Sequence, residues 1–254
     1  MKIGIVLSGG AARGIAHIGI LKALNELGIK PDVISGTSAG AIIGAYYAAG
    51  FTPDEILRIA SATNMFRLSD ILFNKGGLFK ASTLRFQLEK NLKGLTFEEL
   101  KLPLFAVATD FTNASSYYFS SGEIIPALLA SSAIPGLYQP VEHKSLTLVD
   151  GGLLNNLPTE PLTGICDIII GCHVNPIDKN MSNISIREAI DRSVHIAIGK
   201  SVREKEKLCH LFIEPPQLSK YGLFDLNKAT ELFNIGYHYT LKFKEDIEKL
   251  LNNN

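Results

Sequence analysis

Short runs of apolar residues alternate with longer amphipathic segments along most of this chain. Runs of this length that end in glycine, serine or aspartate are typical of buried strands. The pattern predicts strands over Ile3–Leu7, Val33–Ser35, Leu104–Thr109, Tyr117–Ser120 (an edge strand), Leu146–Val149, Ile168–Val174 and Leu211–Glu214. Apolar positions at helical spacing predict helices over Ala12–Leu27, Ala39–Ala49, Pro53–Ala62, Ser82–Leu92, Glu123–Ser131, Ile184–Lys205 and Leu226–Leu251.

The predicted elements form one continuous alternation of strands and helices. Gly28 and Gly50 follow the first two helices at the position of a C-cap glycine, which supports both helix ends. Several strands are apolar without a break, as parallel strands are when both of their faces are covered. No repeat, low-complexity segment or linker interrupts the pattern. We therefore predict an α/β fold, with a mostly parallel central sheet covered by helices on both faces, in a single domain over residues 1–254.

The composition limits the function. The 25 basic and 25 acidic residues give a formal net charge of zero, which argues against nucleic acid as a partner. Apolar residues make up 46% of the chain, which is enough for a sizeable core and too much for a disordered protein. The three cysteines are too few for a disulfide framework and form no CxxC pair. We therefore expect no structural zinc and a reducing, cytoplasmic location.

Two apolar stretches raise the question of a membrane segment. The N-terminal run before Ser8 is too short for a signal peptide. Residues 33–53 carry no charge and are long enough to span a bilayer. They also contain four glycines, and Ser35, Thr37 and Ser38 lie near their front, which favours a buried strand, a sharp turn and a buried helix.

A G-x-S-x-G sequence, Gly36-Thr37-Ser38-Ala39-Gly40, stands between a predicted strand and a predicted helix. Its glycines allow a tight turn that exposes the serine at the helix N-terminus. There the helix dipole and the amide of Ala39 favour a developing negative charge. The pattern therefore indicates a nucleophilic Ser38, and the alternative is a tight turn in which Ser38 is only the N-cap.

A second glycine-rich sequence, Gly9-Gly10-Ala11-Ala12-Arg13-Gly14, joins the first strand to the first helix. Small residues there expose backbone N–H groups that can hold an oxyanion or a phosphate. Close packing of the helix on the strand is the other interpretation. A P-loop is excluded because no Gly-Lys-Ser/Thr follows, and Ala11 stands where the dinucleotide fingerprint needs glycine.

A third site is Asp150-Gly151-Gly152, directly after a predicted strand. A carboxylate at a strand end can act as the general base for a serine, although Asp-Gly is also a common turn pair. Asp110 ends another strand and is the alternative base. Histidines downstream of Asp150, such as His173 and His195, lie inside predicted elements, so we expect none to complete a Ser-His-Asp triad.

Together these motifs resemble those of the patatin-like phospholipases, in particular the bacterial single-domain members. That family combines a glycine-rich oxyanion loop, a G-x-S-x-G elbow and a D-G-G/A motif, which occur here in the same order. Further similar stretches extend the resemblance from residue 3 to about residue 240. They include Leu104–Asp110, Ala130-Ser131-Ser132-Ala133-Ile134-Pro135-Gly136, Asn155-Asn156-Leu157-Pro158, Phe224-Asp225 and Gly236-Tyr237.

The resemblance implies a patatin-like three-layer α/β/α fold and a Ser–Asp dyad without histidine. Ser38 would be the nucleophile and Asp150 its base. The resemblance assigns the remaining motif residues to two groups. The oxyanion hole would use the amides of Gly9, Gly10, Ala11 and Ala39, and motif support would come from Arg13, Gly14, Gly36, Gly40, Gly151 and Gly152. Ala11 departs from the family, since many members have a third glycine there. Its methyl group keeps the amide donor but disfavours a positive φ.

The implied activity is hydrolysis of lipid carboxylic esters, as in a phospholipase, lysophospholipase or esterase, through an acyl-enzyme and without a metal or an organic cofactor. Its partners would be lipid or small ester substrates, met in transient contact with a membrane surface. The alternatives are acyl transfer on the same dyad, a non-catalytic lipid-binding or regulatory protein, and a nucleotide-binding module. Residues 56–80 are either a lid or acyl-chain wall, or a helical excursion packed on the core.

Overall fold

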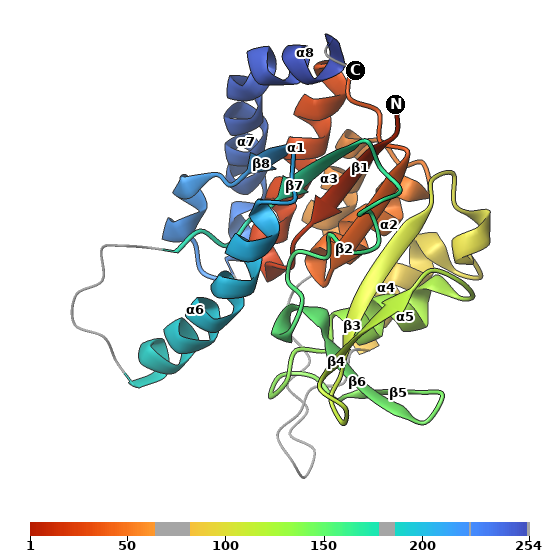
Figure 1. The fold of residues 1–254 in the computed structure, drawn as a ribbon. Coiled ribbons are helices and arrows are strands. Elements are labelled where there is room, and N and C mark those ends of the chain that lie inside the picture. Colours follow the sequence, from red (N-terminus) through yellow and green to blue (C-terminus); the bar gives the residue numbers. More distant parts are fainter. Residues whose placement is uncertain (64–81, 178–185, 224, 253–254) are drawn as a thin grey trace.

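The structure is a computed structural model that describes residues 1–63, 82–177, 186–223 and 225–252. One sheet forms its centre (Figure 1). In the described ranges this sheet has eight strands in the order β5-β6-β3-β2-β1-β7-β8, with β4 beside β3. The strands are β1 (Ile3–Leu7), β2 (Val33–Thr37), β3 (Leu104–Asp110), β4 (Ser115–Phe119), β5 (Val141–His143), β6 (Leu146–Asp150), β7 (Ile168–Cys172) and β8 (Leu211–Ile213).

The centre of the sheet is parallel and one end of it is antiparallel. β1 pairs in parallel with both β2 and β7, and the parallel pairs β2–β3 and β7–β8 continue the sheet on either side. β4 and β6 each run antiparallel to β3, and β5 runs antiparallel to β6. The mostly parallel sheet predicted from the apolar strands is therefore confirmed.

Each face of the sheet is covered by a different set of elements. The helices are α1 (Ile15–Glu26), α2 (Ala39–Ala48), α3 (Pro53–Thr63), α4 (Ser82–Leu92), α5 (Ile124–Ser131), α6 (Ile186–Glu206), α7 (Ala229–Thr240) and α8 (Lys244–Asn252). On β1, Ile5 and Leu7 belong to the large core shared with α1, α2, α5 and α7. Val6 points to the other face and packs with Leu162 and with Val202 of α6. This alternation buries both faces of β1, as the continuous apolar run requires.

α1 and α7 pack unusually closely on the large core, through two glycines. A Cβ added to Gly19 would lie 2.0 Å from the Phe233 carbonyl oxygen, and one added to Gly236 would lie 2.1 Å from the Ala16 carbonyl oxygen. The two helix backbones can touch only because neither position carries a side chain. The Gly236-Tyr237 pair noted in the sequence therefore has a packing role.

Several predicted boundaries are wrong. The helix predicted over Leu226–Leu251 is divided into α7 and α8 by a 3-10 turn at Leu241–Phe243. At this break the Thr240 hydroxyl donates to the Gly236 carbonyl, and such back-bonding bends helices. The first helix begins at Ile15, after a 3-10 turn over Ala11–Gly14. β5 was not predicted, and most of the candidate lid at residues 56–80 lies outside the described residues.

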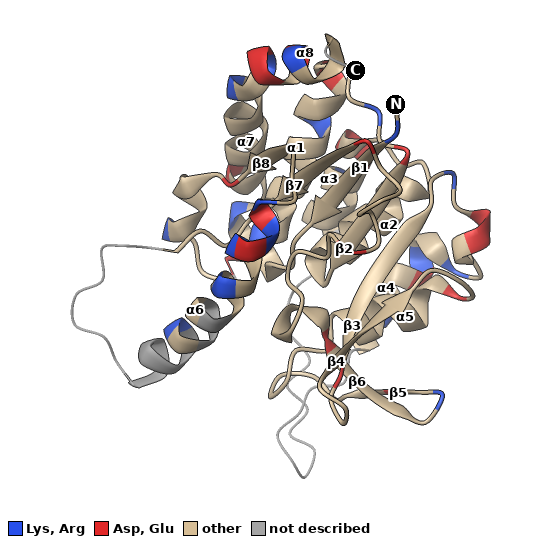
Figure 2. Ribbon diagram, in the orientation of Figure 1, with Lys and Arg blue, Asp and Glu red and all other residues tan. Residues whose placement is uncertain are grey.

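Charge and hydropathy add little to this picture. Basic and acidic residues are interspersed on the described part of α6 and on α8 (Figure 2), as on solvated helix faces. Among the helices in the described ranges, none is long and apolar enough to cross a membrane.

Candidate active site

Ser38 occupies a strained turn between β2 and α2. β2 ends at Thr37 and α2 begins at Ala39, so a single residue reverses the direction of the chain. Its backbone has φ 52° and ψ −121°, in a region that residues with a side chain rarely adopt. Only 6% of Ser38 is exposed, and this exposed part lines a pocket. Backbone strain at a serine in a strand–turn–helix is the geometry of a nucleophile elbow.

Two glycines make this turn sterically possible. A Cβ on Gly40 would lie 2.3 Å from the Leu7 carbonyl oxygen, so α2 begins in direct contact with the end of β1. A Cβ on Gly36 would lie 2.7 Å from the backbone of Gly40. Both positions of the G-x-S-x-G motif therefore need glycine for close approach of backbone to backbone.

The elbow is also held by side chains from neighbouring elements. The Ser38 N–H donates to the Ser131 hydroxyl at 2.9 Å, and that hydroxyl donates to the Val107 carbonyl at 2.6 Å. The Thr37 hydroxyl donates to the Asn155 carbonyl at 2.8 Å. No role was assigned to Ser131 from the sequence, although it belongs to a stretch similar to the family. It bridges the end of α5, the centre of β3 and the backbone of Ser38.

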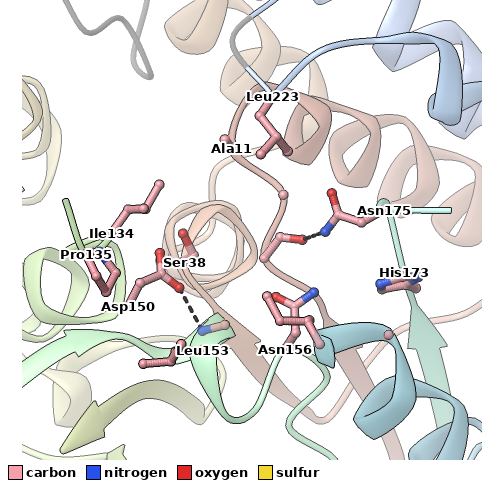
Figure 3. A pocket seen from close by; sticks show the side chains of 15 residues that line it. Ala11, Ser38, Ile134, Pro135, Asp150, Leu153, Asn156, His173, Asn175 and Leu223 are labelled. Atoms are coloured by element: carbon pink, nitrogen blue, oxygen red, sulfur yellow. Dashed lines mark hydrogen bonds between the residues drawn. The ribbon is translucent and has the colours of Figure 1, made fainter. Parts of the chain in front are cut away.

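The sheet itself brings Asp150 to Ser38. Thr37, the last residue of β2, pairs with Val107 of β3. Asp150, the last residue of β6, pairs with Ala108, the next residue of β3. β4 occupies the other edge of β3 along this stretch, so β2 and β6 meet end to end on one edge. Two residues that are far apart in the chain therefore lie side by side because of the register of β3, and Figure 3 shows Ser38 and Asp150 next to each other.

The Asp150 carboxyl group is buried and fixed in orientation. Its Oδ1 accepts a hydrogen bond from the Gly152 N–H at 2.7 Å, and its own N–H donates to the Ala133 carbonyl at 2.9 Å. A Cβ on Gly151 would lie 2.2 Å from a backbone carbonyl of β3, so the turn after Asp150 sits directly on that strand. Burial raises the pKa of Asp150 from 3.8 to about 6. The nearby Ser38 hydroxyl and the Gly152 N–H lower this pKa, but the effect of burial is larger. A carboxylate with this pKa is a stronger base than an ordinary aspartate.

The glycine-rich loop forms the opposite wall of the site. Gly9, Gly10 and Ala11 line the same pocket as Ser38, and a Cβ on Gly9 would lie 3.3 Å from the Cβ of Ser38. Within the described residues, the N–H groups of Gly9, Gly10, Ala11 and Ala39 donate to no protein acceptor. These amides are available to a negatively charged oxygen in the pocket.

The loop tolerates the departure from the family pattern at Ala11. Its φ is 46°, in the left-handed region that favours glycine. At the preceding position glycine is required, because a Cβ on Gly10 would lie 2.5 Å from Val174 Cγ2. The methyl group of Ala11 therefore adds strain without removing its N–H.

Arg13 and Gly14 fasten this loop to its surroundings. The Arg13 Nε donates to the Tyr221 carbonyl at 2.7 Å. A Cβ on Gly14 would lie 2.5 Å from the Cβ of Ala39, so the loop packs against the first residue of α2. Both residues support the geometry of the loop from outside the pocket.

The pocket is a cavity of about 190 Å³, and its lining is mostly apolar with a few polar groups. Gly9, Gly10, Ala11, Ser38, Asp150 and Gly152 contribute the backbone and side-chain groups described above. Ile134, Pro135, Leu153, Ile198 and Leu223 supply apolar surface, and Asn156, His173, Asn175 and Gly199 line the remainder. This combination suits a ligand with one reactive polar group and an apolar chain.

The histidines do not form a triad with Ser38 and Asp150 in the described part of the chain. His173 lines the pocket, but its Nδ1 donates to Glu214 at 2.7 Å. His210 accepts from an amide of β7, and His238 lies on α7. His195 lies in α6, where its side chain is outside the described residues. Among the described residues, no cluster of His, Cys, Asp or Glu could hold a metal ion.

Asp110, the alternative base, is engaged elsewhere. Its carboxylate accepts the N–H groups of Thr112 and Asn113 and the Asn113 side-chain amide at 2.7 Å. The hydrogen bond from the Asn113 side chain, opposed by burial, lowers the pKa of Asp110. A weakly basic carboxylate with three donors caps its own turn.

We therefore expect Asp110→Asn to keep kcat/KM for a reaction at this pocket within about threefold of wild type, because its hydrogen-bond donors leave the Asp110 carboxylate a weak base. Steady-state kinetics on protein whose fold has been checked by circular dichroism measures this. A loss as large as that caused by Asp150→Asn would instead identify Asp110 as the base.

Comparisons with known proteins place these motifs in context. The family model for patatin-like phospholipases matches residues 5–163, which include Ser38 and Asp150. An uncharacterized NTE family protein of Mycobacterium tuberculosis is 35% identical over 178 residues, which cover 68% of this chain and 49% of that protein. Lysophospholipase nte1 of Aspergillus fumigatus is 28% identical over 97% of this chain and 18% of its own length. The chain thus spans about half the length of the mycobacterial relative and a smaller part of the fungal one.

A solved structure supports the fold. VipD from Legionella pneumophila matches with a TM-score of 0.63 and 15% sequence identity, over 96% of this chain and 67% of that one. At this low sequence identity, the similarity supports the fold alone.

Proposed function

Because this chain belongs to the patatin-like phospholipase family, we propose that it is a serine acyl hydrolase that cleaves carboxylic esters of lipids. In this proposal residues 1–254 act as one catalytic unit, with Ser38 as the nucleophile and Asp150 as the base. The observation that carries the proposal is the strained Ser38, with φ 52°, beside a buried aspartate whose pKa is raised to about 6. Strain of this kind persists where the surrounding structure imposes it, and it is concentrated at functional sites.

Acylation begins with attack of Ser38 Oγ on the ester carbonyl carbon, while the hydroxyl proton passes to the Asp150 carboxylate. The carbonyl oxygen becomes an oxyanion, held by the free N–H groups of Gly10, Ala11 and Ala39 together with that of Gly9. The N-terminus of α2 adds the positive end of its dipole. The tetrahedral intermediate then collapses, the C–O bond to the alcohol breaks, and Asp150 returns the proton to the leaving oxygen. The acyl group remains on Ser38 as an ester.

Deacylation repeats these steps with water. Asp150 takes a proton from a water molecule as its oxygen attacks the acyl carbon, and the same amides hold the second oxyanion. The intermediate expels Ser38 Oγ, which recovers the proton from Asp150, and the free acid leaves. A single carboxylate thus serves both half-reactions, in agreement with the lack of a positioned histidine in the described site.

The substrate class follows from the pocket and from the relatives. The apolar wall of the pocket suits an acyl chain. The name of the fungal relative, a lysophospholipase, favours phospholipids or lysophospholipids among lipid esters. We propose that the protein works in the cytoplasm and meets these lipids in transient contact with a membrane surface.

Mass spectrometry of released fatty acid tests the proposal. Purified protein is incubated with short-chain esters, lysophospholipids and phospholipids, with Ser38→Ala in parallel and with an added acceptor alcohol in a second series. We expect free acid from the wild-type protein and none from Ser38→Ala. Release by both proteins, or by neither, contradicts the proposal, and an acylated acceptor in place of free acid identifies an acyltransferase.

A further inference from the structure

The carbonyl of Gly9 has two hydrogen-bond donors, one of them from a distant part of the chain. The hydroxyl of Ser8 donates to it at 3.0 Å. The side-chain amide of Asn175 donates to it at 2.6 Å. Asn175 follows the end of β7 and is partly buried. In Figure 3 its dashed hydrogen bond reaches the glycine-rich loop from the side opposite to Ser38.

These two hydrogen bonds fix the orientation of the whole peptide unit between Gly9 and Gly10. The carbonyl of Gly9 and the N–H of Gly10 belong to one planar peptide unit, and in a trans peptide they point in opposite directions. When the carbonyl is held toward Asn175, the N–H of Gly10 is turned the other way, toward Ser38. Glycine places little steric restriction on this peptide, so a rotation that withdraws the donor is otherwise easy.

The packing around Gly10 supports the same role. The Asn175 side chain packs against Gly10, since a Cβ added to Gly10 would lie 3.3 Å from Asn175 Oδ1. The neighbouring residue, Val174, donates its N–H to the Ser8 hydroxyl at 3.1 Å, so one short segment supports both donors to the Gly9 carbonyl.

The side-chain amide of Asn175 also has one unused hydrogen-bonding group. Its Oδ1 is buried and has no hydrogen-bond partner among the described residues. A buried acceptor without a partner destabilises the fold, and an apolar side chain of similar shape avoids that penalty. The arrangement is explained if the other half of the amide, the Nδ2 donor, is needed for the loop.

We propose that Asn175 is a positioning residue for the oxyanion hole: its amide holds the Gly9 carbonyl and thereby aims the Gly10 N–H at the oxygen that becomes charged during acyl transfer. The inference rests on the proposed hydrolase function and extends it to a residue without contact to the reacting atoms. Loss of an oxyanion donor commonly lowers the rate by about 10²–10³-fold. A donor that is present but free to rotate has a smaller effect.

The test is Asn175→Leu, which keeps the approximate shape of the side chain and removes both amide groups. With a p-nitrophenyl ester as substrate, we expect kcat to fall by about 10- to 100-fold with KM within about twofold of wild type. A trifluoromethyl ketone, which forms an oxyanion on Ser38, should lose affinity by the same factor as kcat/KM. A non-hydrolysable ether analogue of the substrate should bind equally well to both proteins, whereas a general disturbance of the pocket would weaken both ligands.

Asn25→Leu is the matched control. Asn25 is a partly buried asparagine near the C-terminal end of α1, and it accepts a hydrogen bond from the Tyr47 hydroxyl of α2. This variant should leave kcat, KM and both affinities unchanged. Asn175→Ala should show the same selective loss and replaces the leucine variant if that variant does not fold. An active wild-type protein with an unchanged kcat in a folded Asn175 variant overturns this inference alone. A wild-type protein without hydrolase activity overturns the proposed function, and this inference with it.

Discussion

Replacing Ser38 by alanine should remove nearly all ester hydrolysis, with turnover reduced by about 10⁴-fold or more. The reason is chemical: no other hydroxyl occupies the turn between β2 and α2, so the acyl group has nothing to bond to. Asp150→Asn should reduce turnover by a similar factor, because an amide does not accept the proton of Ser38. The double variant should be little worse than either single variant, since two residues that act in one step do not contribute independently.

Fatty acid release by the four proteins, measured at saturating substrate, tests this prediction. Ser35→Ala is the matched control, because Ser35 is a buried serine of β2, the strand that leads into the Ser38 turn, and its hydroxyl has no partner among the described residues. It should retain full turnover. An Asp150→Asn protein with most of the wild-type rate would show that another group is the base.

The Asp150→Asn variant should be more stable than the wild-type protein above pH 6, although it is inactive. Burial raises the pKa of Asp150 to about 6 in the folded protein, against an ordinary value of 3.8. The folded state therefore binds the proton more tightly than the unfolded state does. The resulting stabilisation is complete below pH 3.8 and is lost as the pH rises through 6. At pH 8 the ionised, buried carboxylate costs about 3 kcal/mol, and asparagine avoids this cost while it still accepts the Gly152 N–H.

Urea unfolding at pH 4 and pH 8 measures the effect. The free energy of unfolding of Asp150→Asn should exceed that of the wild-type protein at pH 8, and the two should converge at pH 4. Asp110→Asn is the control of opposite sign. The pKa of Asp110 is lowered by its hydrogen bond to Asn113, so its carboxylate stabilises the fold at pH 8 and asparagine should be the less stable residue there. An Asp150→Asn protein that is no more stable than wild type at pH 8 would contradict a raised pKa of Asp150 in the folded protein.

The sequence predicted most of the elements that form the centre of the sheet. Strands such as Ile168–Cys172 are apolar without a break, and glycine-rich turns follow β1 and β2. These signals are local, so they can be recognised without the structure. The three motifs that converge at the pocket were found in the same way, because tight turns and close backbone approach restrict the residues allowed at each position.

The features that were missed depend on contacts between distant residues. β5 becomes a strand only through its pairing with β6, and the meeting of β2 and β6 depends on the register of β3. Ser131 and Asn175 act on backbone groups of other segments, which leaves no characteristic spacing in the sequence. The strained φ of Ala11 follows from the packing of the loop rather than from its own residue type.

The most direct test of the central claim, a nucleophilic Ser38 activated by Asp150, is covalent labelling with a fluorophosphonate followed by intact-mass and peptide mass spectrometry. The wild-type protein should gain one adduct, on Ser38, at a rate that rises with pH through about 6 as the Asp150 carboxyl ionises. Ser38→Ala should gain none, and Asp150→Asn should react far more slowly. An adduct on another residue, or a Ser38 that stays unmodified in the folded wild-type protein, would contradict the claim.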